Sequence, residues 1–286
     1  MGGVAVVHWH LNHEMRSPFG ARSPAPDLEP IGFPPPWKDR PWIFGVMVAS
    51  ANGVVAWKRR GPDDDPVRAI LGTDDTRPER LADRRHMRHL RCFGDVAIGS
   101  QTLRDQPRLV QIPREPGEPP APELYAFREA HGLTREPRVV VYSLHGGLSA
   151  EHPTFNTPGF DAIVVTTAGG EAALSARGVR AKGARFVIED VREPAGLVRA
   201  HQRLASELGV RYLACEGGET ILRALHAAGL LDEVFVTVTA TVIDESKNEG
   251  VLRIFDFEKE GATPVAEGAT SPDSVWRFRR WRFNTR

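Results

Sequence analysis

The chain has little cysteine and no net charge, and both features narrow its possible functions. Among 286 residues the only cysteines are Cys92 and Cys215, which both lie in apolar surroundings. We expect reduced core residues, which disfavours a disulfide-stabilised domain and favours a cytoplasmic protein. The 37 basic and 37 acidic side chains balance. Zero net charge provides no general attraction for nucleic acid or an anionic membrane, so we expect neither as a partner.

Long apolar runs and the common nucleotide-binding signatures are also missing. No run approaches the roughly 18–20 apolar residues that span a bilayer. We expect no secretory signal, because no apolar segment follows a basic one at the N-terminus. No Gly-x-Gly-x-x-Gly follows the first predicted strand, and there is no Walker loop. A nicotinamide cofactor would therefore be held in another way.

Prolines and hydrophobic periodicity divide the chain into an arm and one α/β domain. Residues 1–39 are rich in proline and predict an extended arm, whereas residues 40–286 show regular patterning. A second proline-rich stretch, from Ile112 to Pro122, predicts a surface loop. Strands alternate with helices, which predicts a mainly parallel sheet with helices on both faces. The predicted strands are 42–49, 95–99, 138–142, 161–166, 185–189, 210–215 and 233–240, and the predicted helices are 76–91, 194–208 and 219–228.

The ends of these elements carry further signals. Thr76, followed by proline and glutamate, is expected to cap the helix that runs to Arg91. At the C-terminal end, residues 251–257 and 275–283 are predicted to pair as an antiparallel hairpin. In a regular strand Trp276 and Phe278 would point to one face, and Trp281 and Phe283 to the other. We predict a one-residue bulge at residues 279–280, which would bring all four aromatic rings to the same face.

The most informative segment is 210–234, which predicts a buried strand, a glycine pair, a helix and a second strand. Gly217 and Gly218 fall where the strand ends and the helix begins, so a phosphate could approach the backbone closely there and meet free N–H groups. Glu216 stands directly before them and is a candidate catalytic carboxylate. Its alternative role is to cap the following helix.

Small and hydroxylic residues follow several of the other predicted strands. Ligands of parallel sheets collect at the carboxyl ends of the strands. Backbone N–H groups and hydroxyls at these positions suit the phosphates and ribose of a cofactor. The segments concerned are 50–53, 99–102, 105–109, Ser143, 166–167 and 169–170.

Five short motifs, in this order, are similar to those of one family. They are Arg40-Pro41-Trp42 with Ser50-x-x-Gly53, Asp95-Val-Ala-Ile-Gly99-x-x-Thr102, Asp105-x-Pro107-x-Leu109, Glu216-Gly217-Gly218 and Gly229-Leu-x-Asp232-Glu233. From Arg40 to Phe283 the chain resembles the reductase domain of the bifunctional riboflavin-biosynthesis deaminase-reductase, of the dihydrofolate reductase-like superfamily. The resemblance implies a dihydrofolate reductase-like α/β fold, NADPH-dependent hydride transfer to a small heterocyclic substrate, and a homodimer.

The resemblance also implies a set of site residues. Asn52, Asp105 and Glu216 would be the catalytic set, and Ser50 with Arg108 or Arg114 would bind the substrate, the arginines through a phosphate. NADPH would contact Gly99, Ser100, Thr102, Ser143, Gly217, Gly218, Glu219, Thr220 and Ile221. Because a nicotinamide cofactor carries the chemistry itself, the protein mainly supplies placement and electrostatics.

The chain departs from the family pattern in its substrate half. Asn52 replaces a common aspartate, and Val46 replaces a common lysine. The helix-leading motif Ser-x-Trp-Ile-Thr is not recognisable at residues 70–74, and the spacing from Thr102 to Asp105 is one residue short. No His-x-Glu with a downstream Pro-Cys-x-x-Cys occurs, so we expect no zinc deaminase chemistry.

Several of these residues also have a purely structural interpretation. Asn52-Gly53 suits an ordinary hairpin turn, and Asp105 an ordinary turn aspartate. Asp232-Glu233 suits a helix-to-strand connection. His8, His10 and His13 have a spacing that a metal could use, but without a fourth ligand in the arm we expect no metal site. For function, the alternatives to a pyrimidine reductase are a reductase of unrelated substrate and a non-catalytic nucleotide-binding protein.

Overall fold

The structure is a computed structural model that describes residues 7–11, 33–59, 61, 63–108, 110–113 and 121–284. Its centre is a ten-stranded sheet with the order β1-β11-β12-β9-β2-β8-β4-β5-β6-β7. The seven strands from β9 to β7 in this order run parallel, and β12, β11 and β1 continue the sheet antiparallel. These strands are β1 (His8–Leu11), β2 (Trp42–Ala49), β4 (Asp95–Gly99), β5 (Val139–Ser143), β6 (Ala162–Thr166), β7 (Arg185–Ile188), β8 (Tyr212–Cys215), β9 (Glu233–Val238), β11 (Ala262–Ala269) and β12 (Arg277–Phe283).

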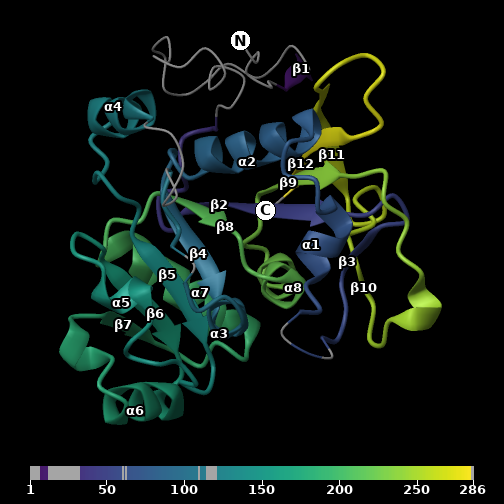
Figure 1. Cartoon of the computed structure of the whole chain (residues 1–286). Coiled ribbons are helices and arrows are strands. Elements are labelled where there is room, and N and C mark those ends of the chain that lie inside the picture. Colours follow the sequence, from purple (N-terminus) through teal and green to yellow (C-terminus); the bar gives the residue numbers. More distant parts are fainter. Residues whose placement is uncertain are drawn as a thin grey trace.

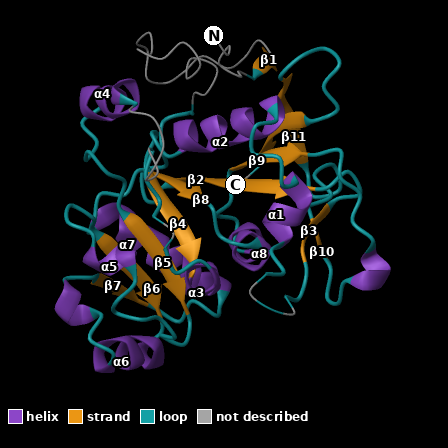
Figure 2. Ribbon diagram, in the orientation of Figure 1, coloured by secondary structure: helices purple, strands orange, loops and turns teal. Residues whose placement is uncertain are grey.

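Helices cover both faces of this sheet (Figures 1 and 2). The α-helices are α1 (Pro66–Leu71), α2 (Pro78–Leu90), α3 (Ser100–Asp105), α4 (Pro122–Ala130), α5 (Pro153–Asn156), α6 (Ala168–Ala176), α7 (Pro194–Ser206) and α8 (Glu219–Ala227). Short 3₁₀ turns span Arg180–Lys182 and Glu245–Lys247, and a separate small ladder joins β3 (Val54–Ala56) to β10 (Leu252–Arg253). The expected mainly parallel α/β fold with antiparallel C-terminal strands is therefore confirmed.

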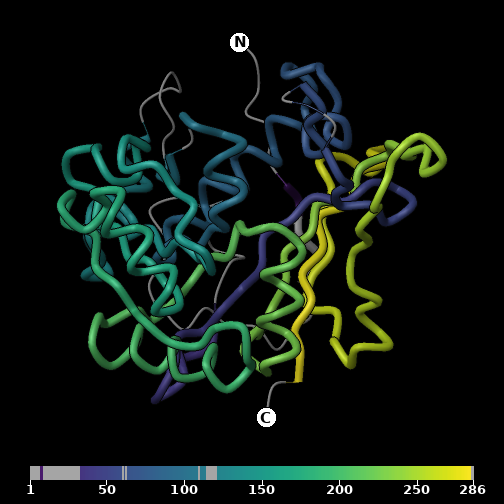
Figure 3. Tube along the Cα trace, turned by 90° about the horizontal axis from the view of Figure 1, so that it is seen from below, coloured from purple at the N-terminus to yellow at the C-terminus, as the bar shows by residue number. Residues whose placement is uncertain are grey.

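The alternation of side chains along each strand divides the core between the two faces. Helices α7 and α8 pack on one face, where Leu204 and Leu222 meet residues of β2 and β5 such as Ile43 and Val140. On the other face Phe44 and its neighbours pack against α2 and α4. A third cluster continues that face toward α3, α5 and α6. Figure 3 shows the C-terminal strands, in yellow, on one side of the molecule and the teal half of the chain on the other.

Most predicted strands and helices occur within one or two residues of their predicted bounds, but the start of α2 differs. Its N-cap is Arg77, not Thr76. The Thr76 hydroxyl instead donates to the Asp74 carboxylate at 2.7 Å, in a turn before the helix. The proline at 78 determines this start, because a proline at the first helical position needs no hydrogen bond from its own nitrogen.

The predicted C-terminal hairpin has a different partner and no bulge in its second strand. β12 pairs with β11 (Ala262–Ala269), whereas part of the predicted 251–257 strand forms β10. The pairing of β12 with β9 is uninterrupted, and the irregularity lies on β11 between Pro264 and Ala266. The prediction of a bulge at residues 279–280 is therefore wrong, and the aromatic rings of β12 occupy two faces.

Buried charge explains why these rings do not share a face. Phe278 lies on the same side as Arg280, which is 1% exposed and pairs with the fully buried Glu233 at 2.6 Å. The Arg280 guanidinium also stacks 4.9 Å from the ring centroid of Phe33 and 4.8 Å from that of Phe235. An arginine that stacks on aromatic rings can be a core residue, which the hydrophobic pattern alone does not predict.

Part of the predicted N-terminal arm packs into the core. Phe33 is 1% exposed, and the indole of Trp37 donates to Asp232 at 2.9 Å. Asp232 also holds Arg40 through two hydrogen bonds of 2.8 Å and accepts the backbone N–H of Ile43. Asp232 therefore fixes the connection before β9, as one interpretation of the sequence holds. Most of the arm lies outside the described residues, as do Arg114 and His13.

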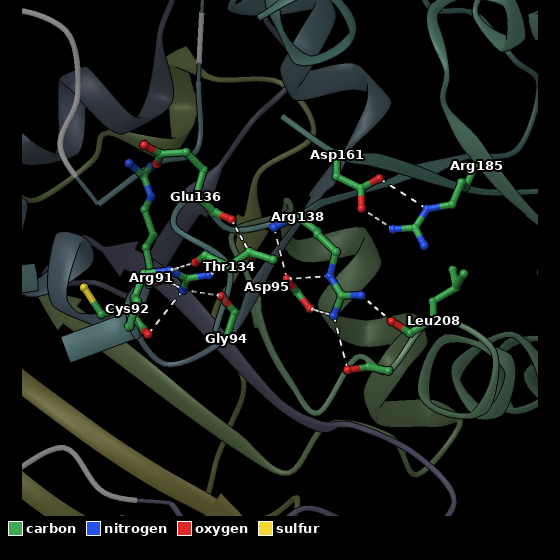
Figure 4. Close-up of polar contacts among 12 residues, drawn as sticks. Arg91, Cys92, Gly94, Asp95, Thr134, Glu136, Arg138, Asp161, Arg185 and Leu208 are labelled. Atoms are coloured by element: carbon green, nitrogen blue, oxygen red, sulfur yellow. Dashed lines mark hydrogen bonds and ion pairs between the residues drawn. The ribbon is translucent and has the colours of Figure 1, made fainter. Parts of the chain in front are cut away.

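Other buried charges fasten the loops on the amino-terminal side of the sheet (Figure 4). Arg138 pairs with Asp95 and donates to the carbonyl of Leu208, which ties the start of β4 to the end of α7. The fully buried Arg128 donates to the carbonyls of Arg91 and Gly94, at 3.0 and 2.8 Å. The turn between α2 and β4 is therefore fixed by hydrogen bonds from outside it.

Both cysteines are free and buried, as predicted. Burial raises the pKa of each thiol to about 12, so neither is a nucleophile near neutral pH. Among the residues that the structure describes, no helix is long and apolar enough to cross a membrane. The described residues also include no group of three or more histidine, cysteine or acidic side chains placed to hold a metal.

Candidate active site

A cavity of about 800 Å³ opens at the carboxyl ends of the central parallel strands. Its lining comes from β2, from the β3–α1 loop and from α3. The turn from β8 into α8, at Gly217 and Gly218, also contributes to it. This position follows from the topology, because β2, β8 and β4 are parallel neighbours and end at the same edge.

A second chamber of about 370 Å³ continues the first toward α2 and β9. The two share lining residues from β2, together with Thr102, Gln106 and Glu216. Ile98 and Phe235 line the second chamber but not the first, and they add apolar surface to it. We call the 800 Å³ space the outer chamber and the 370 Å³ space the inner chamber.

Glu216 lies between the two chambers and is held by an arginine. The Arg91 guanidinium donates from Nε and Nη2 to the two carboxylate oxygens, at 2.6 and 2.9 Å. The side chains are 2% and 8% exposed, so the pair is buried. Gly218 is the N-cap of α8 and no side chain caps that helix, which disfavours the capping alternative for Glu216. The carboxylate faces the cavity with its charge balanced.

Asp105 lies at the end of α3, on the wall of the outer chamber. Its carboxylate accepts from Gln101 at 2.9 Å and pairs with Arg59 of the β3–α1 loop at 3.2 Å. Both residues line the outer chamber, so their ion pair joins the end of α3 to the β3–α1 loop there. Asp105 and Glu216 are thus brought to one cavity, as the resemblance implies.

Asn52 and Ser50 have a different environment. The Asn52 side chain donates to the carbonyl of Ile243 at 2.9 Å and accepts from the Ile243 N–H at 3.0 Å. The Ser50 hydroxyl donates to Asn52 and accepts from the N–H of Val54. Neither residue lines the two chambers. These bonds connect the β2–β3 turn to the segment after β9, so the Asn52 side chain holds two distant parts of the chain together.

The residues expected to contact NADPH lie around the outer chamber. Thr102, Gly217, Gly218 and Glu219 line it, and Ser100 and Thr220 occupy the first turns of α3 and α8. Gly99 and Ile221 have a packing role, since a β-carbon at Gly99 would lie 2.8 Å from the Ile221 side chain. A β-carbon at Gly218 would meet no atom within 4 Å. The open backbone at Gly218 fits a phosphate placed at the start of α8.

A third cavity, of about 530 Å³, lies at the ends of β5, β6 and β7. It is lined by the start of α6, by His145 and by Arg192. Ser143, the last residue of β5, is 2% exposed, and its hydroxyl has no hydrogen-bond partner among the residues that the structure describes. A buried hydroxyl without a partner is uncommon, so Ser143 is a fitting contact for a bound polar group. This edge of the sheet therefore offers one cavity at β2, β4 and β8 and another at β5–β7.

The predicted phosphate-binding arginines are not among the cavity residues. Arg108 is exposed and lies outside the three cavities described above, and Arg114 lies outside the described residues. Arg59 and Arg104 line the outer chamber, and Arg80 and Arg84 line the inner one. Sequence reasoning missed these four cations because three of them come from segments with no family motif.

Sequence reasoning also missed Asp83, an acidic residue of the inner chamber. It lies on α2, one turn before Met87 and two turns before Arg91, and the hydroxyl of Thr237 on β9 is its hydrogen-bond partner. A signal was present in the sequence. Residues 80, 83, 87 and 91 follow the helical repeat, so three charged side chains and one methionine share one face of a helix that packs on the sheet.

Sequence comparisons give no relative: neither a family model nor a curated protein matches the chain. Comparison with solved structures finds the fold among pyrimidine reductases. A pyrimidine reductase-like protein of Corynebacterium diphtheriae superposes with a TM-score of 0.61 at 17% identity, covering 85% of this chain and 92% of that one. The Saccharomyces cerevisiae riboflavin biosynthesis reductase Rib7 gives 0.50 at 12% identity, covering 86% and 91%.

A third similar structure is a longer, bifunctional protein. The diaminohydroxyphosphoribosylaminopyrimidine deaminase/5-amino-6-(5-phosphoribosylamino)uracil reductase of Thermotoga maritima superposes with a TM-score of 0.56 at 16% identity. The match covers 86% of this chain but 57% of that one. The present chain thus spans a little over half of the bifunctional protein. At these identities the comparisons establish the fold, which is the one that the sequence resemblance implied.

Proposed function

We propose that this protein is an NADPH-dependent reductase that transfers a hydride to a small heterocyclic substrate, like 5-amino-6-(5-phosphoribosylamino)uracil reductase. The observation that carries the proposal is the pair of cavities along one edge of a pyrimidine-reductase-like sheet. A dinucleotide has two ends, and this edge offers the open backbone of Gly218 beside one cavity and the unpartnered hydroxyl of Ser143 near the other.

The residues present fit the cofactor. The N-terminus of α8 supplies free N–H groups beside Gly217 and Gly218, which suits a phosphate. The start of α6, with Thr167 as its N-cap and Gly169-Gly170 in its first turn, lines the third cavity together with Arg192. When bound, NADPH would supply the hydride, and the chain would position the two reactants and exclude water.

The inner chamber suits the substrate. Val46, Ile98 and Phe235 provide apolar walls for a flat ring, and the paired carboxylate of Glu216 lies where the two chambers meet. Val46 takes the place of a lysine common in the family, so this chamber has one cation fewer on β2. We infer that the substrate differs from the family's in the group that this lysine would contact.

A ligand titration with one glycine variant tests the proposal. NADPH at 100 times its dissociation constant should stabilise the fold by about 2.7 kcal/mol, and NADH and flavin mononucleotide should stabilise it less. Gly218→Ala should leave the melting temperature of the free protein unchanged, because its new methyl group meets no neighbour. It should weaken NADPH binding, because that methyl group stands where the phosphate approaches.

The same titration distinguishes the alternatives. Absence of an NADPH shift in the wild type would refute the proposal, and a shift with the flavin alone would indicate a different redox chemistry. Saturable NADPH binding without turnover on ribosylaminopyrimidine, pterin and imine substrates would favour the non-catalytic nucleotide-binding protein. We also propose a cytoplasmic homodimer, which light scattering of the purified protein would test for its oligomeric state.

A further inference from the structure

Two arginines of helix α2 contribute positive charge to the wall of the inner chamber. Arg80 and Arg84 lie one turn apart on this helix, and both line the chamber. Each reaches the same atom, Oδ1 of Asp75, at 2.9 Å from Nε of Arg80 and 3.4 Å from Nη2 of Arg84. Asp75 is 63% exposed and lines neither chamber. Two cations therefore share one carboxylate that lies mostly in solvent, which leaves the pair with an excess of positive charge.

Arg80 also has a hydrogen-bond donor that the fold does not use. Its side chain is 16% exposed, and Nε is the nitrogen that bonds to Asp75. The terminal nitrogen Nη1 is buried, and in the described part of the chain it has no hydrogen-bond partner. Buried polar groups nearly always have a partner, and a charged donor without one destabilises the folded state. An oxygen atom of a ligand in the inner chamber can supply the missing acceptor.

The other titratable groups of the inner chamber do not cancel this excess of positive charge. Arg91 and Glu216 neutralise each other in a buried pair at 2.6 Å. Asp83 lies between the two arginines in the sequence, but burial raises its pKa and so disfavours its charged form. His86 has its pKa lowered by burial to about 3, so it is neutral near neutral pH. The α2 wall of the chamber therefore favours an anion.

We propose that the substrate carries an anionic group, a carboxylate or a phosphate, which Arg80 and Arg84 bind while the ring of the substrate lies against Phe235. The proposal rests on the proposed reductase function and adds the charge and the orientation of the substrate to it. Guanidinium groups bind the oxygens of both anions through directional, charge-assisted hydrogen bonds. Arg80 would donate from Nη1, and Arg84 is 44% exposed and free to turn from Asp75 toward the anion. This site lies on α2, whereas the family resemblance indicated arginines after α3.

The first test uses small probes and needs no cofactor. Benzoate and benzamide have the same shape but differ in charge, and inorganic phosphate represents the second kind of anion. In calorimetry the wild type should bind benzoate or phosphate more tightly than benzamide, by on the order of 10-fold or more. Preference for benzoate would assign a carboxylate, and preference for phosphate a phosphate group. Equal or absent binding of all three probes would overturn the proposal.

Three variants locate the bound anion. Arg84→Met removes a half-exposed side chain, so the protein should still fold, and it should weaken anion binding by on the order of 10-fold while the affinity for benzamide stays the same. Arg203→Met is the matched control, because that arginine pairs with Glu207 on α7 and lines none of the three cavities. Gly218→Ala alters the proposed cofactor phosphate site at α8. Anion binding that falls in Gly218→Ala but not in Arg84→Met would refute the α2 site.

The second test uses turnover with pairs of substrates that differ only in the anion, such as a heterocyclic carboxylate and its amide. The wild type should prefer the anionic member in kcat/KM by on the order of 10-fold or more. Arg84→Met should lose this preference through a higher KM for the anionic member, with kcat little changed, because the contact holds the substrate and the transition state alike. Arg203→Met should keep it.

The outcomes separate this proposal from the function on which it rests. A wild type that binds the anion at α2 but neither binds NADPH nor turns over would keep the anion site and remove the reductase function. An active wild type that treats the anionic and neutral substrates alike would remove only the anion site. An anion preference that survives in Arg84→Met and in Arg80→Lys would also remove it, because neither arginine would then be the contact.

Discussion

Replacing Arg91 by methionine should make this protein much less stable, because Glu216 would be left in the folded state as a buried charge without a partner. Arg91 is 2% exposed and Glu216 8%, and two short hydrogen bonds join them. A third bond runs from Arg91 to the carbonyl of Ile112 at 3.0 Å, and it too would be lost. Methionine is apolar and flexible, so it fills most of the vacated space but satisfies neither oxygen.

The expected loss is large for one substitution. Breaking a buried ion pair by removing one partner costs about 3–5 kcal/mol. In a domain of this size each kcal/mol lowers the melting temperature by roughly 2–4 °C, so a fall on the order of 6–20 °C is expected. The double variant Arg91→Met with Glu216→Gln removes the unpaired charge and should recover much of this loss.

The pH dependence has a definite sign. In Arg91→Met the buried, unpaired Glu216 would have its folded-state pKa raised above the unfolded value of about 4.3. The folded state then holds a proton that the unfolded state releases, so the variant loses stability as the pH rises above that value. Urea unfolding of both proteins at pH 5 and pH 8 should show a larger difference at pH 8. A loss below about 1 kcal/mol at pH 8, or an equal loss at both pH values, would refute a buried pair.

Two further predictions concern other buried charges. Glu233→Gln should cost about 3–5 kcal/mol in urea unfolding, because Arg280 is then buried without its carboxylate; a loss under about 1 kcal/mol would contradict this. Burial lowers the pKa of His86 and His89 to about 3 and that of His201 to about 4. Their unfolded-state pKa is about 6.5, so stability should fall as the pH drops below that value, by up to about 1.4 kcal/mol per pH unit for each histidine. Unfolding midpoints between pH 7 and pH 5 would measure it, and His201→Phe should flatten the curve.

Glu216 illustrates how the position of a residue can be predicted from the sequence while its contacts cannot. The sequence places this carboxylate at a strand end facing a cleft, and the structure agrees. A carboxylate at a strand end that faces a cleft is expected to make few packing contacts. The ion pair with Arg91 changes that expectation, because the alanine variant would leave a buried arginine without a partner.

The sequence by itself determined the alternation of strands and helices. Continuous apolar runs such as 42–49 can be buried only between two layers of helices, and Gly217-Gly218 marks the turn from β8 into α8. These are local patterns, since each depends on residues within one element or its immediate neighbours. The motifs at 95–102 and 216–218 are local patterns of this kind too. For this reason the fold could be predicted, and with it the edge of the sheet that holds the cavities.

Only the tertiary structure decided which side chains meet. Arg91 and Glu216 are 125 residues apart, Asp83 and Thr237 more than 150, and no periodicity connects them. The sequence did not determine the strand that pairs with β12 either. Which strands become antiparallel neighbours depends on how the complete faces of the sheet pack, and not on the residues of one strand. A charge such as that of Arg280 enters the core when a carboxylate and aromatic rings converge on it, and this convergence exists only once the chain is folded.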